Sequence, residues 1–486
     1  MVDTKGPFQI VRLPRVPRVV NATAAFMYRG PVAFRYAHPE IVTRRQSDDP
    51  AVLYDGYKDD VVSNRILRFL ERRYPEHAKV YEIGRSTQGR PLLALKISDN
   101  VAVDEDEPSF LFNGAHHGNE PLTPDFPIDL ATVLLGALDG PEDRLLPRVK
   151  SEFVEAHFRE MFGGLKRRYQ SETLETYVRE FEIWIVPVVN PDGLSAYWNR
   201  DVSMGRKNGR DTAPPIGRID RRDGVDLNRN YPFYWKSTNN AASSDRPDNY
   251  YYRGPSAASE PETRAMMALA ERERFVMAFS FHSWATKVLV PYTIDEVMNP
   301  FPHVAQKIGE DLARAAVSFQ PAKDYVADRN LYPVDGTDED WLHFKFGTMA
   351  FIIESSYHTP DYGTLGRKCI QGLRSLSLRA LELYRRGPVL TVHVRDEPSE
   401  VERRLADFEK RPAIGSPREG MRVRIKEFAY FEGETFTTDR HGRIDFFLPE
   451  PGQFTVEASK DRRNKKTRRV RCDGGVCRLQ ITLTGP

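Results

Sequence analysis

Cysteine, long apolar runs and an excess of charge are all scarce in this chain. Only three cysteines occur among 486 residues, which excludes a disulfide framework. Two of them, Cys472 and Cys477, bracket the residues DGGV and would either close a small hairpin or remain thiols. Because neither a further cysteine nor a histidine lies near them, they do not form a zinc knuckle.

The sequence also lacks the segments that direct a chain into or across a membrane. No apolar run approaches the ~18 residues that are needed to span a bilayer. The N-terminus mixes basic residues with short apolar pieces and has no apolar core of the kind found in signal peptides. We therefore predict no transmembrane segment, and the localisation stays unknown, with cytoplasmic as the default.

Positive and negative side chains are nearly equal in number: 71 Lys and Arg stand against 69 Asp and Glu, which gives a net charge of +2. A balance of this kind produces no overall field that would attract nucleic acid or an anionic membrane. We expect no nucleic-acid partner, and the oligomeric state is not indicated. The partner must therefore be inferred from a site.

The pattern of the chain divides it into three parts. Residues 1–52 contain many prolines and are predicted to be an irregular N-terminal extension. Residues 53–387 alternate apolar runs with helical periodicity, which predicts an α/β fold with a mixed, largely parallel sheet flanked by helices. Residues 388–486 contain about seven short strands with turn residues between them, which predicts a small C-terminal β-sandwich.

The individual elements follow from periodicity and flanking turn residues. The helix over 258–274 should begin with a capping box made by Ser259 and Glu262. The other predicted helices cover 61–74, 126–138 and 150–180, and the predicted strands cover 80–83, 92–97, 110–112, 181–193, 275–281 and 347–353. In the tail, strands are predicted at 389–395, 421–427, 433–438, 443–448, 453–458, 467–471 and 477–483.

Metal-binding side chains follow three of the predicted strands. His117 and Glu120 lie three residues apart in FLFNGAHHGNEP (110–121), His282 follows 275–281, and Glu354 follows 347–353. Ligands bind at the carboxyl ends of strands in such sheets. Two imidazoles and one carboxylate, His117, Glu120 and His282, would hold Zn²⁺ and leave a fourth position open, as catalytic zinc requires. Neighbouring side chains point apart, so His116 is interpreted as an outer or packing histidine.

Eight motifs occur in order along the chain: HGNE at 117–120, VPVVNPDG at 186–193, GRKN at 205–208, GVDLNRN at 224–230, RGPSAASEPET at 253–263, FHS at 281–283, LYPVDGTDEDW at 331–341 and FIIES at 351–355. They resemble the motifs of the zinc carboxypeptidase family and follow the family's order, so that the resemblance covers residues 54–386. The implied activity is that of a metallocarboxypeptidase, which hydrolyses the C-terminal bond of a peptide or protein. The tail from 389 is similar in strand pattern to the transthyretin-like sandwich of the family's regulatory-type branch.

The resemblance implies roles for the catalytic groups. His117, Glu120 and His282 would bind one Zn²⁺ per chain. Glu354 would be the general base, which takes a proton from zinc-bound water and passes it to the leaving amine. Arg206 would stabilise the oxyanion together with the metal.

The resemblance also implies roles in substrate binding. Asn228 and Arg229 would hold the terminal carboxylate of the substrate, Arg229 in a bidentate pairing. Tyr332 matches a mobile tyrosine that closes over the bound tail. Asp226 matches the carboxylate that orients the imidazole of His117.

Glu339 aligns with the residue that decides side-chain preference in this family, because Asp340 lies eight residues after Tyr332. An acid at this place would favour a C-terminal Lys or Arg. The alternative is that Glu339 points to solvent.

Two other functions stay open at this point. The same fold acting on glutamylated tails or peptidoglycan peptides would need basic pocket residues, and Glu339 counts against it. A non-catalytic binding module with the sandwich as its interaction surface would normally lack a ligand or the base, and neither is missing. The basic run at 459–471 is interpreted as a solvated hairpin turn, with binding to an anionic surface as the alternative.

Overall fold

The structure is a computed structural model. Its N-terminal part includes the two-residue strands β1 (Val2–Asp3) and β2 (Ile10–Val11), which pair antiparallel, and the helix α3 (Pro50–Tyr54). Residues 44–47 and 49 are described as well, whereas the rest of the predicted extension lies outside the described residues, as does 150–170 of the predicted helix over 150–180. The described residues are 2–3, 10–11, 44–47, 49–138, 171–199, 205–214, 216–217, 219–237, 243–295, 297, 303–318, 320, 323–430, 433–434, 436–461 and 464–483.

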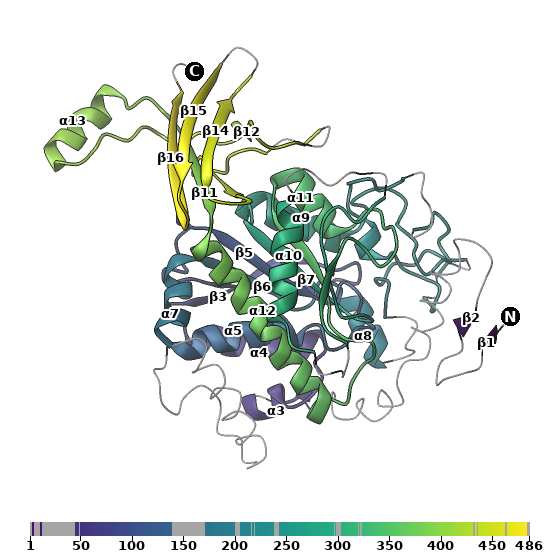
Figure 1. Cartoon of the computed structure of the whole chain (residues 1–486). Helices are drawn as coiled ribbons and strands as arrows, with labels where there is room; N and C mark the ends of the chain where they lie inside the picture. The colour runs from purple at the N-terminus through teal and green to yellow at the C-terminus, as the bar shows by residue number, and fades with distance from the viewer. Residues whose placement is uncertain are drawn as a thin grey trace.

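An eight-stranded mixed sheet forms the centre of the described chain, in the order β3-β4-β6-β5-β7-β10-β8-β9 (Figure 1). The four central strands β6, β5, β7 and β10 are all parallel, whereas β4 and β8 flank them antiparallel. The predicted mixed sheet is therefore confirmed. Its strands are β3 (Ala78–Arg85), β4 (Pro91–Ile97), β5 (Ser109–Gly114), β6 (Glu182–Val186), β7 (Met277–His282), β8 (Lys287–Leu289), β9 (Val326–Asp328) and β10 (Met349–Glu354).

Side chains of the central strands alternate between two apolar cores. In β5, Phe110 and Phe112 enter the larger core, whereas Leu111 enters the core on the other face, as the period of two along a strand requires. The helices α4, α5, α7, α10 and α12 contribute to the larger core, and α9 and α11 to the other. These helices are α4 (Asp60–Arg73), α5 (Asp125–Ala137), α7 (Ser171–Glu180), α9 (Pro261–Glu273), α10 (Val304–Ala315), α11 (Asp338–Phe346) and α12 (Arg367–Arg386); α8 (Pro191–Asn199) follows β6.

The predicted capping box at the start of α9 is wrong. The residue at the N-cap is Glu260, and no side-chain hydrogen bond caps the helix. Glu262 instead accepts hydrogen bonds from the Thr87 backbone N–H (2.8 Å) and from Asn208 Nδ2 (3.2 Å). Tertiary partners have therefore replaced the local contact.

Among the described residues after Gly387, two three-stranded sheets enclose their own apolar core, in the orders β13-β11-β16 and β12-β14-β15. The strand predicted at 433–438 does not form; only an isolated bridge joins Thr437 to Arg422. The described part of that segment contacts both domains: Phe436 is buried in the sandwich core, and Glu434 accepts a hydrogen bond from Tyr292 of the main domain. The strands are β11 (Val389–Asp396), β12 (Arg422–Ile425), β13 (Arg443–Phe447), β14 (Gly452–Ser459), β15 (Lys465–Cys472) and β16 (Val476–Leu483).

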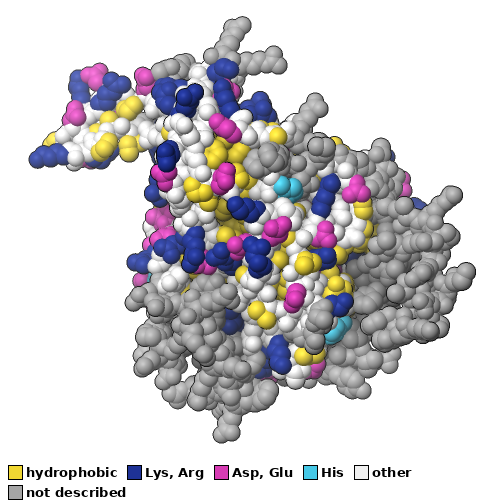
Figure 2. Space-filling view, in the orientation of Figure 1, with side chains coloured by type: hydrophobic (Ala, Val, Ile, Leu, Met, Phe, Trp, Pro, Cys, Tyr) yellow, Lys and Arg dark blue, Asp and Glu magenta, His cyan; other side chains and the backbone are white. Residues whose placement is uncertain are grey.

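A helix that the sequence analysis did not predict, α13 (Glu400–Glu409), projects from the sandwich away from the main domain (Figure 1). Its residues Val401 and Phe408 are 75% and 86% exposed. Figure 2 shows hydrophobic and basic side chains together on this projecting segment.

The structure also bears on the two cysteines of the tail and on the absence of a transmembrane segment. Cys472 and Cys477 are both free, so the hairpin over 465–483 carries no disulfide. Within the described residues, no helix has the length and apolar character that would let it cross a membrane.

Candidate active site

The carboxyl ends of the central strands bring the predicted site together. His282 is the last residue of β7 and Glu354 the last residue of β10, and the two are direct neighbours in the parallel register. The segment after β5 turns tightly to place His117 beside them. A Cβ on Gly118 would lie 2.1 Å from the backbone N of Leu194, so only glycine permits this approach.

His117, Glu120 and His282 form one compact, buried group. The Nδ1 atom of His117 lies 2.9 Å from Glu120 Oε1 and 3.2 Å from His282 Nδ1, and Glu120 Oε2 lies 3.2 Å from His282 Nδ1. Tetrahedral ligands at 2.0–2.1 Å from one zinc ion lie roughly 3.3 Å apart. The spacing and the chemistry of these donors therefore fit a single Zn²⁺ ion.

Asp226 lies behind His117 and links it to Arg206. Its Oδ1 is 3.1 Å from His117 Nε2, and its Oδ2 accepts hydrogen bonds from Arg206 Nε (2.8 Å) and Nη2 (2.6 Å). Burial alone would raise the pKa of Asp226, but Arg206, Arg229 and His117 hold it well below its ordinary 3.8. The ionised carboxylate therefore orients the imidazole so that Nδ1 faces the other two donors.

Ser280 supports the second imidazole and was missed by the sequence analysis. Its hydroxyl lies 3.2 Å from His282 Nε2 and donates to Asn113 Oδ1 at 3.0 Å. Residues two apart in a strand share one face, so the position of Ser280 two residues before His282 was a usable signal.

His116 lies outside the group of donors that could share one ion. Its Nε2 is 3.1 Å from the hydroxyl of Tyr231, and its Nδ1 is 3.1 Å from the hydroxyl of Ser280. Burial lowers the pKa of His116 to about 4, so the ring is neutral near pH 7. Both of its nitrogens thus have partners outside the His-Glu-His cluster.

Glu354 is a buried carboxylate with an unused oxygen. Glu354 is 8% exposed, and its Oε2 atom has no hydrogen-bond partner among the described residues. Burial and the nearby charge of Glu120 raise the pKa of Glu354 well above its ordinary 4.5, against the pull of Arg206 and Arg229. A buried carboxylate oxygen without a partner, next to a cluster of metal-binding side chains, indicates a candidate functional group.

Two buried arginines line the same space. The guanidinium of Arg206 lies 4.9 Å from the ring centre of Tyr251 and 5.0 Å from that of Tyr250, and that of Arg229 lies 5.7 Å from Tyr251. Tyr251 and Tyr250 were missed because aromatic residues in a long loop give no periodic signal. Tyr332 is half-buried. Burial would lower the pKa of Arg206, but Asp226 and then Tyr250, Tyr251 and Tyr332 raise it above its ordinary value.

The side chain of Asn228 joins the cluster to the start of α11. Its Nδ2 lies 3.5 Å from His282 Nε2, and its Oδ1 accepts a hydrogen bond of 2.9 Å from the Asp338 backbone N–H. The next residue of α11, Glu339, is 1% exposed, so the alternative that it points to solvent is wrong. Within the part of the chain that the structure describes, neither of its carboxylate oxygens has a hydrogen-bond partner, and burial with Asp340 and Asp338 raises its pKa well above 4.5.

A buried polar network, also missed, holds the loop that carries Arg206. Asn208 Nδ2 donates to Glu260 Oε2 at 2.8 Å, and Asn208 Oδ1 accepts from the Val225 backbone N–H at 2.9 Å. These contacts tie the segments on which Arg206 and Asp226 lie. They span 17 to 52 residues of sequence, which local patterns cannot predict.

A buried His-Glu-His group at strand ends, with an unpaired carboxylate and two arginines around it, has the donors and charges of a zinc hydrolase. Residues 63–363, well over half of the chain, match the family model described as zinc carboxypeptidase. The chain therefore belongs to the zinc carboxypeptidase family, and its class is that of the metallocarboxypeptidases, which are peptidases with a zinc cofactor and peptide substrates.

Relatives of known sequence and structure agree with this placement. Carboxypeptidase B of Helicoverpa zea is 25% identical over 68% of this chain and 72% of its own length. The crystal structure of carboxypeptidase A from Helicoverpa armigera has a TM-score of 0.52 at 22% identity, covers 68% of this chain and 74% of that chain, and shows the shared fold. A protein named inactive metallocarboxypeptidase ECM14, of Ajellomyces dermatitidis, is 24% identical over 52% of this chain and 38% of its own length.

Proposed function

We propose that this chain hydrolyses the C-terminal peptide bond of peptides and releases one residue at a time. The observation that carries the proposal is the unpaired Glu354 carboxylate beside the buried His117, Glu120 and His282 group. These three residues would hold one Zn²⁺ per chain. When bound, the ion supplies a Lewis acid that polarises the scissile carbonyl and activates water.

Glu354 has the position of the general base. Its free oxygen would take a proton from the attacking water and pass it to the nitrogen of the departing residue. In the protein without a cation, burial and Glu120 favour the protonated form of Glu354. With a divalent cation held by His117, Glu120 and His282, the pKa of Glu354 would fall and its ionised form would be favoured.

Two arginines support the recognition of a free C-terminus. Arg206 is oriented by Asp226 and would donate to the oxygen that becomes negative as the tetrahedral intermediate forms. Arg229, with Asn228, would pair with the substrate's terminal carboxylate, and Tyr332 would close over it. A substrate whose C-terminus is amidated offers no carboxylate to Arg229.

Glu339 supports a preference for C-terminal Lys or Arg. Its buried carboxylate has no hydrogen-bond partner, so a basic side chain that entered the pocket would supply the missing partner. Because burial favours the neutral acid, binding of a basic side chain should release a proton from Glu339. The same acid disfavours the alternative substrates with glutamylated tails.

One experiment tests the reaction and the metal together. Purified protein is analysed for zinc, and its activity is measured on blocked dipeptides with Arg, Leu or Glu at the C-terminus, each as the free acid and as the amide. We expect one zinc per chain, hydrolysis of free acids with Arg preferred, and loss of activity with a chelator that added zinc restores. Equal cleavage of the amides would contradict the exopeptidase assignment.

The same assays distinguish an enzyme from a non-catalytic binding module. This alternative is worth testing because one relative is named inactive. No turnover of any dipeptide by the zinc-loaded protein would favour the module.

The Glu339→Gln variant, which keeps the size of the side chain, should lose the preference for Arg over Leu while it still hydrolyses the Leu substrate. An unchanged preference would remove Glu339 from the pocket.

A further inference from the structure

The helix α11 connects the proposed substrate pocket to the C-terminal sandwich. At its first turn, the Asp338 backbone N–H donates to Asn228 at the site. At its other end, the Phe436 ring of the sandwich lies so close to Gly347 that a Cβ there would stand 3.1 Å from the ring. Gly347 also has φ +75°, which favours glycine at this position, and a Cβ there would make a tight contact with the ring.

A second line of contacts runs from the sandwich to the same helix. Glu434, which is 2% exposed, accepts a hydrogen bond from the hydroxyl of Tyr292. The residue after Tyr292 is Thr293, whose backbone N–H and hydroxyl both donate to the Asp340 carboxylate at 2.9 Å. Asp340 directly follows Glu339. Only three residues therefore separate the sandwich from the proposed specificity residue.

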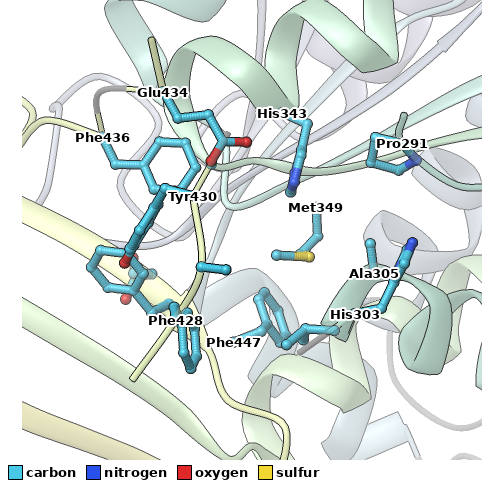
Figure 3. A pocket seen from close by; sticks show the side chains of 15 residues that line it. Pro291, His303, Ala305, His343, Met349, Phe428, Tyr430, Glu434, Phe436 and Phe447 are labelled. Carbon is cyan, nitrogen blue, oxygen red and sulfur yellow. The ribbon is translucent and has the colours of Figure 1, made fainter. Parts of the chain in front are cut away.

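The packing around this line of contacts is incomplete. A cavity of about 50 Å³ lies between the sandwich and the main domain, with Glu434, Tyr430 and Phe436 on one side and His343 and Met349 among the residues opposite (Figure 3). The hydrogen bond from Tyr292 to the buried Glu434 is the specific link, because leaving either group unpaired would be costly.

The side chain of His343 belongs to the same contact region. Its ring lies edge-on to Tyr292 with 5.3 Å between the ring centres, and its Nδ1 is 2.9 Å from the Thr348 carbonyl oxygen. Burial lowers the pKa of His343 to about 4, so the ring is an uncharged packing group near pH 7. Tyr292 is therefore held between α11 and the sandwich.

We propose that Glu434 is a positioning residue for substrate specificity: through Tyr292 and Thr293 it fixes Asp340, and thereby places the Glu339 carboxylate in the pocket for the substrate's C-terminal side chain. This inference rests on the proposed carboxypeptidase function. Small displacements of a recognition group reduce productive binding strongly. The sandwich thus contributes to substrate choice without touching the substrate.

The test compares Tyr292→Phe and Glu434→Ala with the wild-type chain, using kcat and KM on dipeptides with C-terminal Arg and Leu. We expect the Arg-to-Leu ratio of kcat/KM to fall roughly 2- to 30-fold in both variants, as for other changes within a packed network. The change should be mostly in KM for the Arg substrate. Glu434→Gln keeps the acceptor oxygen and should retain the wild-type ratio.

Tyr384→Phe is the matched control. The Tyr384 hydroxyl also reaches the sandwich, where it donates to Asp445 at 2.9 Å, but it has no contact with α11 among those described. We expect this variant to lower Tm without changing the Arg-to-Leu ratio. A purely structural role for Glu434 would give the same result in Tyr292→Phe, and that outcome would overturn the inference while wild-type activity still supported the proposed function. An inactive wild-type chain would overturn the proposed function itself.

Discussion

Two buried glutamates at opposite ends of the central sheet differ in their partners. Glu182 begins β6 and is 1% exposed; its carboxylate accepts hydrogen bonds from Lys96 Nζ and from the Ser109 hydroxyl. Glu354 ends β10, is also buried, and keeps one oxygen without a partner. A buried charge that the fold compensates has a structural role, whereas one that it leaves uncompensated indicates a ligand or a reaction.

Glu339 extends the same contrast. Like Glu354 it is a proposed site residue, but it lies on α11. Among the described residues, both of its carboxylate oxygens lack a hydrogen-bond partner. Under the proposed function, the two carboxylates would serve two parts of one site: the reacting bond and the pocket for the substrate's side chain. The four predictions that follow test whether a carboxylate's partners decide its role.

The largest effect is expected at the uncompensated carboxylate. Glu354→Gln removes the proton acceptor and should lower kcat/KM by about 10²- to 10⁴-fold, the usual contribution of a general base. Zinc content and Tm should stay near the wild-type values, since no ligand is lost. Steady-state kinetics with metal analysis checks this, and a variant as active as the wild type would contradict the mechanism.

The compensated carboxylate should show the opposite behaviour. Lys96→Met leaves Glu182 buried without its cation and should lower the free energy of unfolding by about 3–5 kcal/mol. Denaturant unfolding measures the loss, and titration of active sites measures the activity per folded molecule. That specific activity should be unchanged; a fall comparable to that of Glu354→Gln would break the distinction.

Glu262 lies between these cases, because it is hydrogen-bonded and still carries a raised pKa. Burial raises its pKa from 4.5 to about 7. Between these two pKa values the folded protein keeps a proton that the unfolded chain releases. The stabilising contribution of Glu262 is therefore fully present below pH 4.5 and is lost as the pH rises to 7. The shift corresponds to about 3 kcal/mol. Glu262→Gln should remove this part of the pH dependence in unfolding experiments between pH 4.5 and 8; identical curves would contradict it.

The smallest effect is expected where charges are paired in water. Arg404 and Glu400 form an ion pair on α13 with side chains 78% and 77% exposed. Exposed pairs of this kind contribute about 0.5 kcal/mol or less. Arg404→Ala should therefore leave unfolding and kinetics close to wild type. A larger loss of stability would contradict the small contribution expected of an exposed pair.

The sequence could place two of the proposed site residues near each other because they lie directly at strand ends. His282 and Glu354 end two apolar strands, and the alternation of strands with helices was enough to bring those ends to one edge of the sheet. The supporting contacts were not predictable in the same way. Tyr251 and the network around Asn208 depend on contacts between segments far apart in the chain, which no local period encodes. Ser280 is different, because its place two residues before His282 in the same strand was a usable local signal.

The pattern Ser-x-x-Glu shows how context decides a local signal. At Ser259 and Glu262 it predicted a capping box that does not form, because Asn208 and Thr87 bind the glutamate. At Ser399 and Glu402 the same pattern does form a capping box, at the start of the exposed α13. Where no tertiary partner competes, the local preference determines the structure.

The main apolar core crosses the boundary predicted between residues 387 and 388. Val389 and Phe447 of the sandwich are counted among the buried side chains of the larger core, beside residues of α12 such as Tyr384. A shortened chain that ends at Gly387 would expose that apolar surface to water. Engineering of a minimal enzyme, or exchange of the sandwich between relatives, therefore has to carry over these two side chains or replace them with groups of similar volume.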